Sequence, residues 1–133
     1  MYLVDTNVWL ERLLDQVRSE EVGHFFDQTP SGSLFITDFA FHSIGVVLNR
    51  LNRMEALLRF VQDAFTDGGV GLVHVEPEDT ERLVRVAERF RLDFDDAYQY
   101  VAGEKYNLTI VSLDDDFDRT ERGRKTPAQV LEG

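Results

Sequence analysis

Four short runs of mostly apolar residues, set far apart along the chain, most constrain its fold. They cover residues 2–4, 34–37, 70–75 and 108–113. Runs of this kind are typical of strands buried on both faces of a sheet. The segments between them carry apolar residues at helical spacing, over residues 6–14, 39–51, 54–65, 77–90 and 93–106. Strands that alternate with helices predict an α/β fold with a parallel sheet covered on both faces.

Residues that favour helix ends support these boundaries. Thr6 or Asn7 is expected to cap the first helix. Asn107 is expected to end the helix that spans residues 93–106. Thr126, directly before a proline, is expected to cap a short last helix.

The length and composition of the chain fit one domain over residues 1–133. Of its 133 residues, 43% are apolar, so the chain can bury a core. It contains no cysteine, which excludes disulfide scaffolds, cysteine-bound zinc and thiol nucleophiles. No apolar run reaches about 18 residues, and the first residues lack the pattern of a signal peptide. We therefore expect a soluble, cytoplasmic protein with no membrane partner.

Acidic residues follow each of the four predicted strands. They are Asp5, Asp38, Glu76 and Asp114, and the neighbours Asp95 and Asp96 stand near the start of the helix before the last strand. The carboxyl ends of parallel strands lie at one edge of a sheet, where α/β folds bind their ligands. We therefore expect several carboxylates to gather at this edge.

The net charge of −11 is concentrated near this predicted cluster. Residues 93–118 contain seven Asp and one Glu against one Lys, a net −7, which leaves −4 for the rest of the chain. Two unit charges about 4 Å apart repel by about 4 kcal/mol at an effective dielectric near 20. A bound cation would relieve this repulsion, and oxygen ligands without cysteine or paired histidine favour Mg²⁺ or Mn²⁺.

Three segments resemble the motifs of one protein family. Residues 3–9, Leu-Val-Asp-Thr-Asn-Val-Trp, resemble the opening of PIN-domain ribonucleases, which include the VapC toxins of toxin–antitoxin pairs. Residues 94–102, with Asp96 before Ala97 at a helix start, resemble their third acidic motif. Residues 107–117 are similar to their strand that ends in Ser/Thr-x-Asp-x-x-Phe. The order and spacing of the three motifs fit essentially the whole chain.

This resemblance implies a three-layer α/β/α sandwich with a short central parallel sheet. It implies an Mg²⁺- or Mn²⁺-dependent endoribonuclease, a hydrolase that cuts RNA phosphodiester bonds. It further implies the toxin of a type II toxin–antitoxin system, with a protein antitoxin as partner and a homodimer as the assembly.

The resemblance also implies roles for individual residues. Asp5, Asp96 and Asp114 would be the catalytic and metal-binding residues, and Asp116 an accessory acid. Asp96 is preferred to its neighbour because it directly precedes an alanine, and adjacent helix residues point about 100° apart. Residues expected to support the metal ligands are Asn7, Ser43, Asp95 and Ser112. Candidates for contact with RNA phosphates, or else for a solvated basic tail, are Arg119, Arg122, Arg124 and Lys125.

One position departs from the family pattern and keeps an alternative open. The family usually carries a glutamate on the helix after the second strand, where this chain has Ser43. Serine is a poorer metal ligand, so we expect one bound metal, with Ser43 acting at most through water. The alternative is a degenerate PIN domain that binds RNA or protein without cutting. A phosphoryl-accepting receiver domain fits less well, because Asp5 is followed by Thr6 and not by a second acid.

Overall fold

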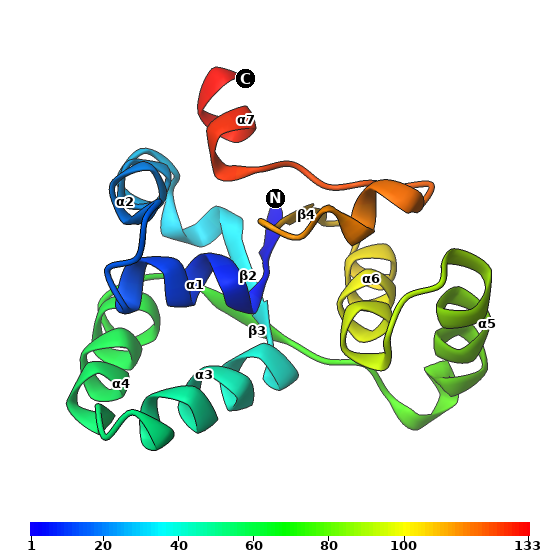
Figure 1. Ribbon diagram of the computed structural model, residues 1–133, viewed down its shortest axis with the longest axis horizontal. Helices are drawn as coiled ribbons and strands as arrows, with labels where there is room; N and C mark the ends of the chain where they lie inside the picture. Colours follow the sequence, from blue (N-terminus) through cyan, green and yellow to red (C-terminus); the bar gives the residue numbers. More distant parts are fainter.

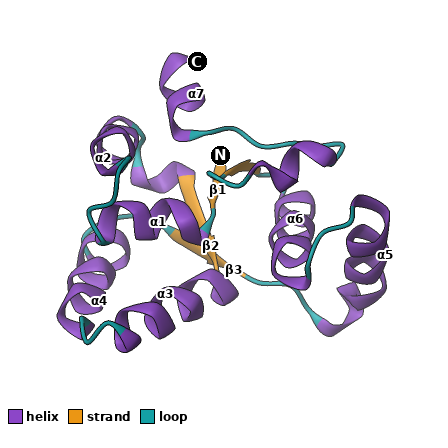
Figure 2. Cartoon of the chain, viewed as in Figure 1, coloured by secondary structure: helices purple, strands orange, loops and turns teal.

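The four apolar runs form the four strands of one sheet. In the computed structural model, which describes residues 1–133, the strands are β1 (Tyr2–Val4), β2 (Leu34–Thr37), β3 (Gly71–Val73) and β4 (Thr109–Val111). β3 and β4 occupy only the middle of the predicted runs 70–75 and 108–113. All neighbouring strands pair in parallel in the order β3-β2-β1-β4, which confirms the predicted parallel sheet (Figure 2).

Helices cover both faces of this sheet. They are α1 (Thr6–Leu13), α2 (Ser19–Gln28), α3 (Asp38–Arg50), α4 (Met54–Val61), α5 (Thr80–Phe90), α6 (Phe94–Tyr106) and α7 (Pro127–Glu132). Short helical turns are η1 (Ser31–Ser33), η2 (Gln62–Thr66), η3 (Pro77–Asp79) and η4 (Asp115–Arg119). Helices α1–α4 lie on one side of the strands and α5 and α6 on the other (Figure 1). None of the helices combines the length and the apolar composition needed to span a bilayer.

Alternating side chains of the strands supply two separate cores. Val4 and Val111 pack with apolar residues of α1–α4, whereas their neighbours Leu3 and Ile110 pack with residues of α5 and α6. Successive side chains of a strand point to opposite faces, so β1, β2 and β4 each contribute to both cores, whereas β3 contributes only Val73 and leaves Leu72 57% exposed. The three-layer α/β/α arrangement is therefore confirmed.

The first helix begins differently from the prediction. Asp5, and not Thr6 or Asn7, is the residue that caps α1, because its Oδ1 accepts a hydrogen bond of 2.8 Å from the Thr6 backbone N–H. Thr6 is already the first helical residue. The carboxylate at the end of β1 therefore also fixes the start of the helix that follows.

The other predicted helix ends are confirmed, with one exception. Asn107 ends α6 in the left-handed conformation, with φ of 53°. Thr126 caps α7 by accepting a hydrogen bond from the backbone N–H of Gln129, whose side chain bonds back to the N–H of Thr126. The helix predicted over residues 54–65 is regular only to Val61 and continues as the wider π-helical turn η2.

Candidate metal centre

An acidic cleft of about 340 Å³ lies where β1 and β4 end. Besides these strand ends, its walls come from the beginnings of α1, α3 and α6. All of its acidic lining residues are aspartates: Asp5, Asp93, Asp95, Asp96, Asp114 and Asp116. The predicted gathering of carboxylates thus includes Asp5, Asp96 and Asp114.

Two of the expected carboxylates do not line this cleft. Asp38 begins α3 and its Oδ1 accepts hydrogen bonds from the Phe39 backbone N–H and the Tyr98 hydroxyl. Glu76 follows β3 and lies 3.7 Å from Nε2 of His74. Of the acids that follow the four strands, those after β1 and β4 therefore meet in the cleft, whereas those after β2 and β3 make other contacts.

Three carboxylates approach each other closely enough to hold one ion. Oxygens of Asp96, Asp114 and Asp116 all lie within 4.8 Å of one another, and all three residues are half-buried. Burial, together with the charges of Asp93, Asp114, Asp5 and Asp116, raises the pKa of Asp96 to about 7 from its ordinary 3.8. A divalent cation bound among these oxygens would offset the repulsion that raises this pKa.

Asp5 lines the same cleft but is not one of the triplet, and three donors hold it. It is only 8% exposed. Its Oδ1 accepts hydrogen bonds from the Thr6 N–H and from Nε2 of Gln99 at 2.9 Å, and its Oδ2 accepts one of 2.7 Å from the Ser112 hydroxyl. Burial raises the pKa of Asp5 above its ordinary value, and these hydrogen bonds work against that rise. The contacts fix the orientation of the carboxylate at the base of the cleft.

Ser112 connects this carboxylate to the last acidic loop. Its hydroxyl donates to Asp5 and accepts hydrogen bonds from the Asp114 backbone N–H at 2.9 Å and from Nδ2 of Asn7 at 3.3 Å. Oδ1 of Asn7 in turn accepts from the Leu113 N–H. Asn7 and Ser112, both expected to support the metal ligands, thus tie the end of β4 to the start of α1.

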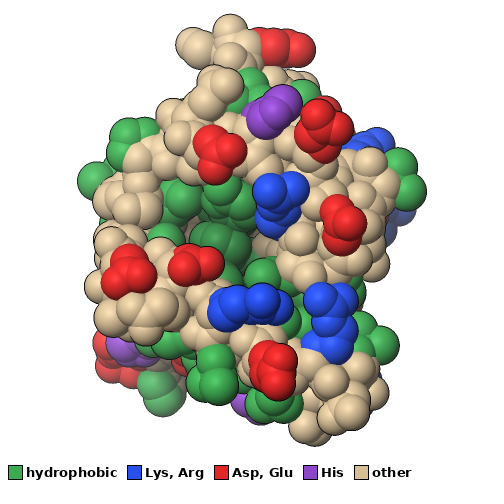
Figure 3. Space-filling model, turned by 90° about the vertical axis from the view of Figure 1, so that its left-hand side faces the viewer, with side chains coloured by type: hydrophobic (Ala, Val, Ile, Leu, Met, Phe, Trp, Pro, Cys, Tyr) green, Lys and Arg blue, Asp and Glu red, His purple; other side chains and the backbone are tan.

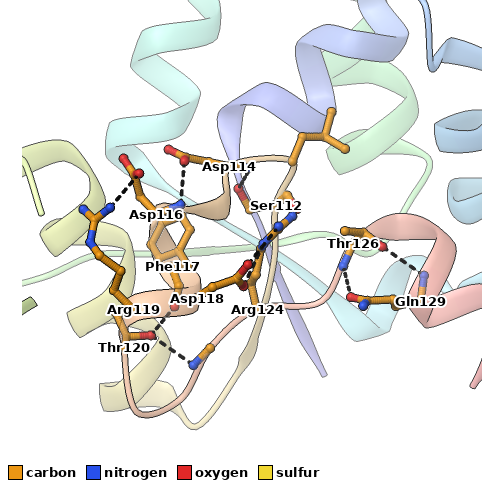
Figure 4. Close-up of polar contacts among 12 residues, drawn as sticks. Ser112, Asp114, Asp116, Phe117, Asp118, Arg119, Thr120, Arg124, Thr126 and Gln129 are labelled. Atoms are coloured by element: carbon orange, nitrogen blue, oxygen red, sulfur yellow. Dashed lines mark hydrogen bonds and ion pairs between the residues drawn. The ribbon is translucent and has the colours of Figure 1, made fainter.

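The turn η4 sets Asp114 and Asp116 relative to each other. Asp114 caps this turn, and its Oδ1 accepts a hydrogen bond of 2.9 Å from the Asp116 backbone N–H. Figure 4 shows the two carboxylates near each other at one end of the loop. Asp116, expected as an accessory acid, thus lies with Asp96 and Asp114.

On α6, the structure separates the two neighbouring aspartates. Asp95 is exposed, whereas Asp96 belongs to the triplet. Asp93 caps the helix by accepting a hydrogen bond of 2.8 Å from the Asp96 N–H. The side chain of Ser43, from α3, lines the same cleft at the position where the resemblance implies a glutamate.

Two residues of the site, Gln99 and Thr37, were not predicted from the sequence. Gln99 is 1% exposed; it donates to Asp5 and accepts a hydrogen bond of 2.6 Å from the Thr37 hydroxyl. The Thr37 hydroxyl also accepts from the Ala40 N–H, which makes it the cap of α3. The available signal was a polar residue three positions after Asp96, on the same face of the helix.

The basic residues after the loop are mostly engaged in the fold. Arg119 pairs with Asp116 at 2.9 Å and donates to two backbone carbonyls at the end of α5. Arg124 pairs with Asp118 and donates to the Ser112 carbonyl (Figure 4). Arg122 donates to the side chain of Asn107 and to the carbonyl of residue 108. These three arginines are not a solvated tail, since each one fastens the loop to the body of the protein.

Lys125 differs from these arginines. Its backbone N–H donates to the Ile110 carbonyl and its carbonyl accepts from the Ser112 N–H. The chain at Lys125 therefore pairs in parallel with β4 through a single bridge to Val111. Its side chain is exposed and forms no ion pair.

A second, larger cavity of about 530 Å³ lies between α1, α2 and α4. Its apolar wall includes Trp9, Phe26 and Phe60, with the rings of Trp9 and Phe26 stacked at 4.5 Å. The charged residues that line it are Arg12, Arg53, Arg59, Asp27 and Asp63. None of these five forms an ion pair. Figure 3 shows this face, with an apolar hollow surrounded by charged side chains.

Comparisons with known proteins agree with the fold. A family model described as "PIN domain" matches residues 2–123. A search of curated proteins found no match to this sequence.

Solved structures with a similar fold include a toxin–antitoxin complex and a VapC toxin. A toxin–antitoxin complex from Klebsiella pneumoniae superposes with a TM-score of 0.75 at 18% identity, over 96% of this chain and 98% of that one. Mycobacterium tuberculosis VapC20, described as a sarcin-ricin loop cleaving toxin, superposes with a TM-score of 0.74 at 18% identity, over 89% of this chain and 93% of that one. FitAcB from Neisseria gonorrhoeae superposes with a TM-score of 0.75 at 18% identity, over 96% of this chain and 99% of that one. At this level of identity, the likeness shows a shared fold.

Proposed function

Because the chain belongs to the PIN domain family, we propose that it is a divalent-metal-dependent endoribonuclease and the toxin of a type II toxin–antitoxin pair. The observation that carries this proposal is the close approach of the Asp96, Asp114 and Asp116 carboxylates in one cleft. VapC20, whose fold this chain shares, is described as cleaving the sarcin-ricin loop, which supports nuclease chemistry on RNA.

The residues of the cleft suit Mg²⁺ or Mn²⁺. The triplet offers three carboxylate oxygens within 4.8 Å, and no histidine lines the cleft. Hard oxygen donors of this kind are the ligands these ions prefer. When bound, the ion would supply positive charge that offsets the negative charge of the scissile phosphate and activates a water for attack.

The chain's own residues would orient the reacting groups. Asp5 is fixed by its three donors and presents a carboxylate of set direction to the cleft. Arg119, which pairs with Asp116, is the cation best placed for an RNA phosphate near the triplet. Arg122, Arg124 and Lys125 lie in the following segment and would contribute to phosphate contacts further along the strand.

The proposed antitoxin would bind the cavity between α1, α2 and α4. Its aromatic wall suits the apolar side chains of a partner, and Arg12, Arg53 and Arg59 lack acidic partners within this chain. Carboxylates on the antitoxin would form ion pairs with these arginines. We expect Arg59→Glu to weaken the antitoxin complex in a calorimetric titration while it leaves RNA cleavage by the free protein unchanged.

A second copy of the chain would bind along α4. On α4, Leu58 is 72% exposed and Met54, four residues before it, is 44% exposed; Leu51, at the end of α3, is 52% exposed. Exposed apolar side chains that are grouped together are typical of an association surface. Sedimentation of the wild type against Leu58→Glu tests this homodimer, because the variant should be monomeric.

The test of the nuclease is cleavage of a labelled RNA pool by the purified protein with Mn²⁺, Mg²⁺ or EDTA. The matched variants are Asp96→Asn and Asp95→Asn, which remove neighbouring acids of the same helix terminus. We expect cleavage with either metal, none in EDTA and none by Asp96→Asn, and substantial activity in Asp95→Asn. Equal loss in both variants would contradict the assigned role of Asp96.

Ser43 favours one alternative function. It lines the cleft with a hydroxyl where the resemblance implies a glutamate, so the cleft has one carboxylate fewer. A folded, metal-saturated protein that binds RNA but does not cut it would identify the chain as a degenerate binding module.

A further inference from the structure

Three aromatic side chains lead from the acidic cleft to the protein surface. Phe39 lines the cleft. Its ring centroid lies 5.8 Å from that of Tyr98, and the Tyr98 centroid lies 6.4 Å from that of Phe94. Phe94 begins α6 and is 62% exposed, two residues before Asp96. We call Phe39, Tyr98 and Phe94 the aromatic platform.

Hydrogen bonds hold the middle of this platform in place. The Tyr98 hydroxyl donates to Oδ1 of Asp38 at 2.8 Å and accepts from the Val75 backbone N–H at 3.1 Å. The same Asp38 oxygen accepts from the Phe39 N–H at 2.7 Å. Asp38, which follows β2 but does not line the cleft, therefore holds the Tyr98 ring and bonds to the backbone of Phe39. A platform that is already ordered loses little conformational freedom when a ligand binds.

The charges around the platform restrict what can cover it. Phe94 stands between Asp93 and Asp95, and the platform borders a cleft lined by six aspartates. An RNA phosphate or an acidic peptide would be repelled there, whereas the uncharged face of a nucleobase would not. Aromatic side chains bind successive bases of single-stranded nucleic acid by stacking, with little dependence on sequence.

Stacking would also add to the affinity that phosphate contacts supply. The net charge is −11, and Arg119, Arg122 and Arg124, the candidates for those contacts, also bond to partners within the fold. Stacking supplies affinity that is independent of this charge balance. The platform is continuous with the cleft through Phe39, so a base stacked on it would belong to a nucleotide near the scissile phosphate.

We propose that the aromatic platform stacks an unpaired base of the RNA next to the bond that is cut, with Phe94 as the outermost ring. This inference rests on the proposed nuclease function and adds a residue that positions the substrate: Phe94, which would hold a base next to the cleavage site. Bases within a duplex are already stacked on their neighbours and do not offer a free face.

The experiment compares the wild type with Phe94→Ala, Phe94→Trp and the control Val84→Ala. Val84 is a comparably exposed apolar residue on α5, outside the cleft. Steady-state cleavage of a short single-stranded RNA is measured with Mn²⁺. Binding of the same RNA carrying 2-aminopurine is followed in parallel by fluorescence, which falls when the base stacks.

We expect Phe94→Ala to lower kcat/KM by about tenfold, mainly through KM, and to abolish the fluorescence change. Phe94→Trp should restore both, and Val84→Ala should alter neither. An RNA with an abasic nucleotide at the stacked position should lower kcat/KM of the wild type by the same factor. It should not lower kcat/KM of Phe94→Ala any further.

The failure of this inference is distinguishable from the failure of the nuclease proposal. Wild-type cleavage that is unchanged in Phe94→Ala overturns the stacking role alone, even if the variant loses a protein partner. Quenching that depends on Phe94 without any cleavage overturns the nuclease and supports the platform. A wild type that neither cuts nor binds the RNA overturns both.

Discussion

Replacement of Asp96 by asparagine should stabilise the metal-free protein near neutral pH. Asp96 is crowded by the carboxylates of Asp5, Asp93, Asp114 and Asp116, and its pKa is raised to about 7 from 3.8. A carboxyl whose pKa is higher in the folded state than in the unfolded chain contributes stability that is fully present below about pH 4. This contribution is lost as the pH rises through the folded-state pKa. At neutral pH, the ionised carboxylate therefore destabilises the fold.

The size of this effect follows from the pKa. A tenfold change in a protonation equilibrium corresponds to about 1.4 kcal/mol. A fully shielded carboxylate with this pKa would therefore lower the free energy of unfolding by about 4 kcal/mol. Asp96 is only half-buried, and solvent screening reduces the expected cost to about 1–2 kcal/mol. For a domain of this length, we expect Tm to rise by about 3–10 °C in Asp96→Asn.

The assay is thermal unfolding in EDTA over a range of pH, with Asp95→Asn as the control. Asp95 lies exposed at the same helix terminus, so its replacement loses the same interaction with the helix dipole, about 0.5 kcal/mol, without relieving the triplet. We expect the stabilisation by Asp96→Asn to shrink to less than half near about pH 4. An Asp96→Asn protein that is less stable than the wild type in EDTA at neutral pH would refute the reasoning.

Three further predictions concern the cleft and its supports. Gln99→Ala removes a buried donor to Asp5, and urea unfolding should show a loss of about 1–3 kcal/mol. Gly45 lies in the middle of α3, where an added Cβ would be 3.9 Å from Cδ2 of Leu57, an ordinary contact distance. Gly45→Ala should therefore stabilise the protein by about 0.5–1 kcal/mol in the same assay. Ser43→Ala should leave Mn²⁺ affinity nearly unchanged while Asp5→Asn lowers it; equal losses would show that Ser43 is a direct ligand.

The strands were predictable because each is a short apolar run, and burial on both faces of a sheet requires such a run. Their bounds were less predictable: the apolar pattern of residues 70–75 continues past Val73, where pairing with β2 has already ended. The start of α1 was ambiguous because Asp5, Thr6 and Asn7 are all good capping residues. Only the packed structure selects Asp5, whose carboxylate also accepts hydrogen bonds from α6 and β4.

The site was predictable in outline for a topological reason. β1 and β4 are neighbours in a parallel sheet, so the acids that follow them meet. Gln99 was missed because its partner Asp5 is 94 residues away, and a helix pattern does not reveal such a contact. Asp38 was expected in the cluster, yet it bonds Tyr98 instead, since side-chain direction at the start of α3 is set by packing and not by position in the sequence.

The most direct test of the central claim is the binding of Mn²⁺ to the EDTA-treated protein, measured by titration calorimetry. It does not depend on which RNA is the substrate. The variants are Asp114→Asn, within the triplet, and Asp115→Asn, its exposed neighbour in the same loop. We expect the wild type and Asp115→Asn to bind the ion alike and Asp114→Asn to bind it at least about tenfold more weakly. A wild type that binds no Mn²⁺, or an equal loss in both variants, would contradict the proposed metal centre.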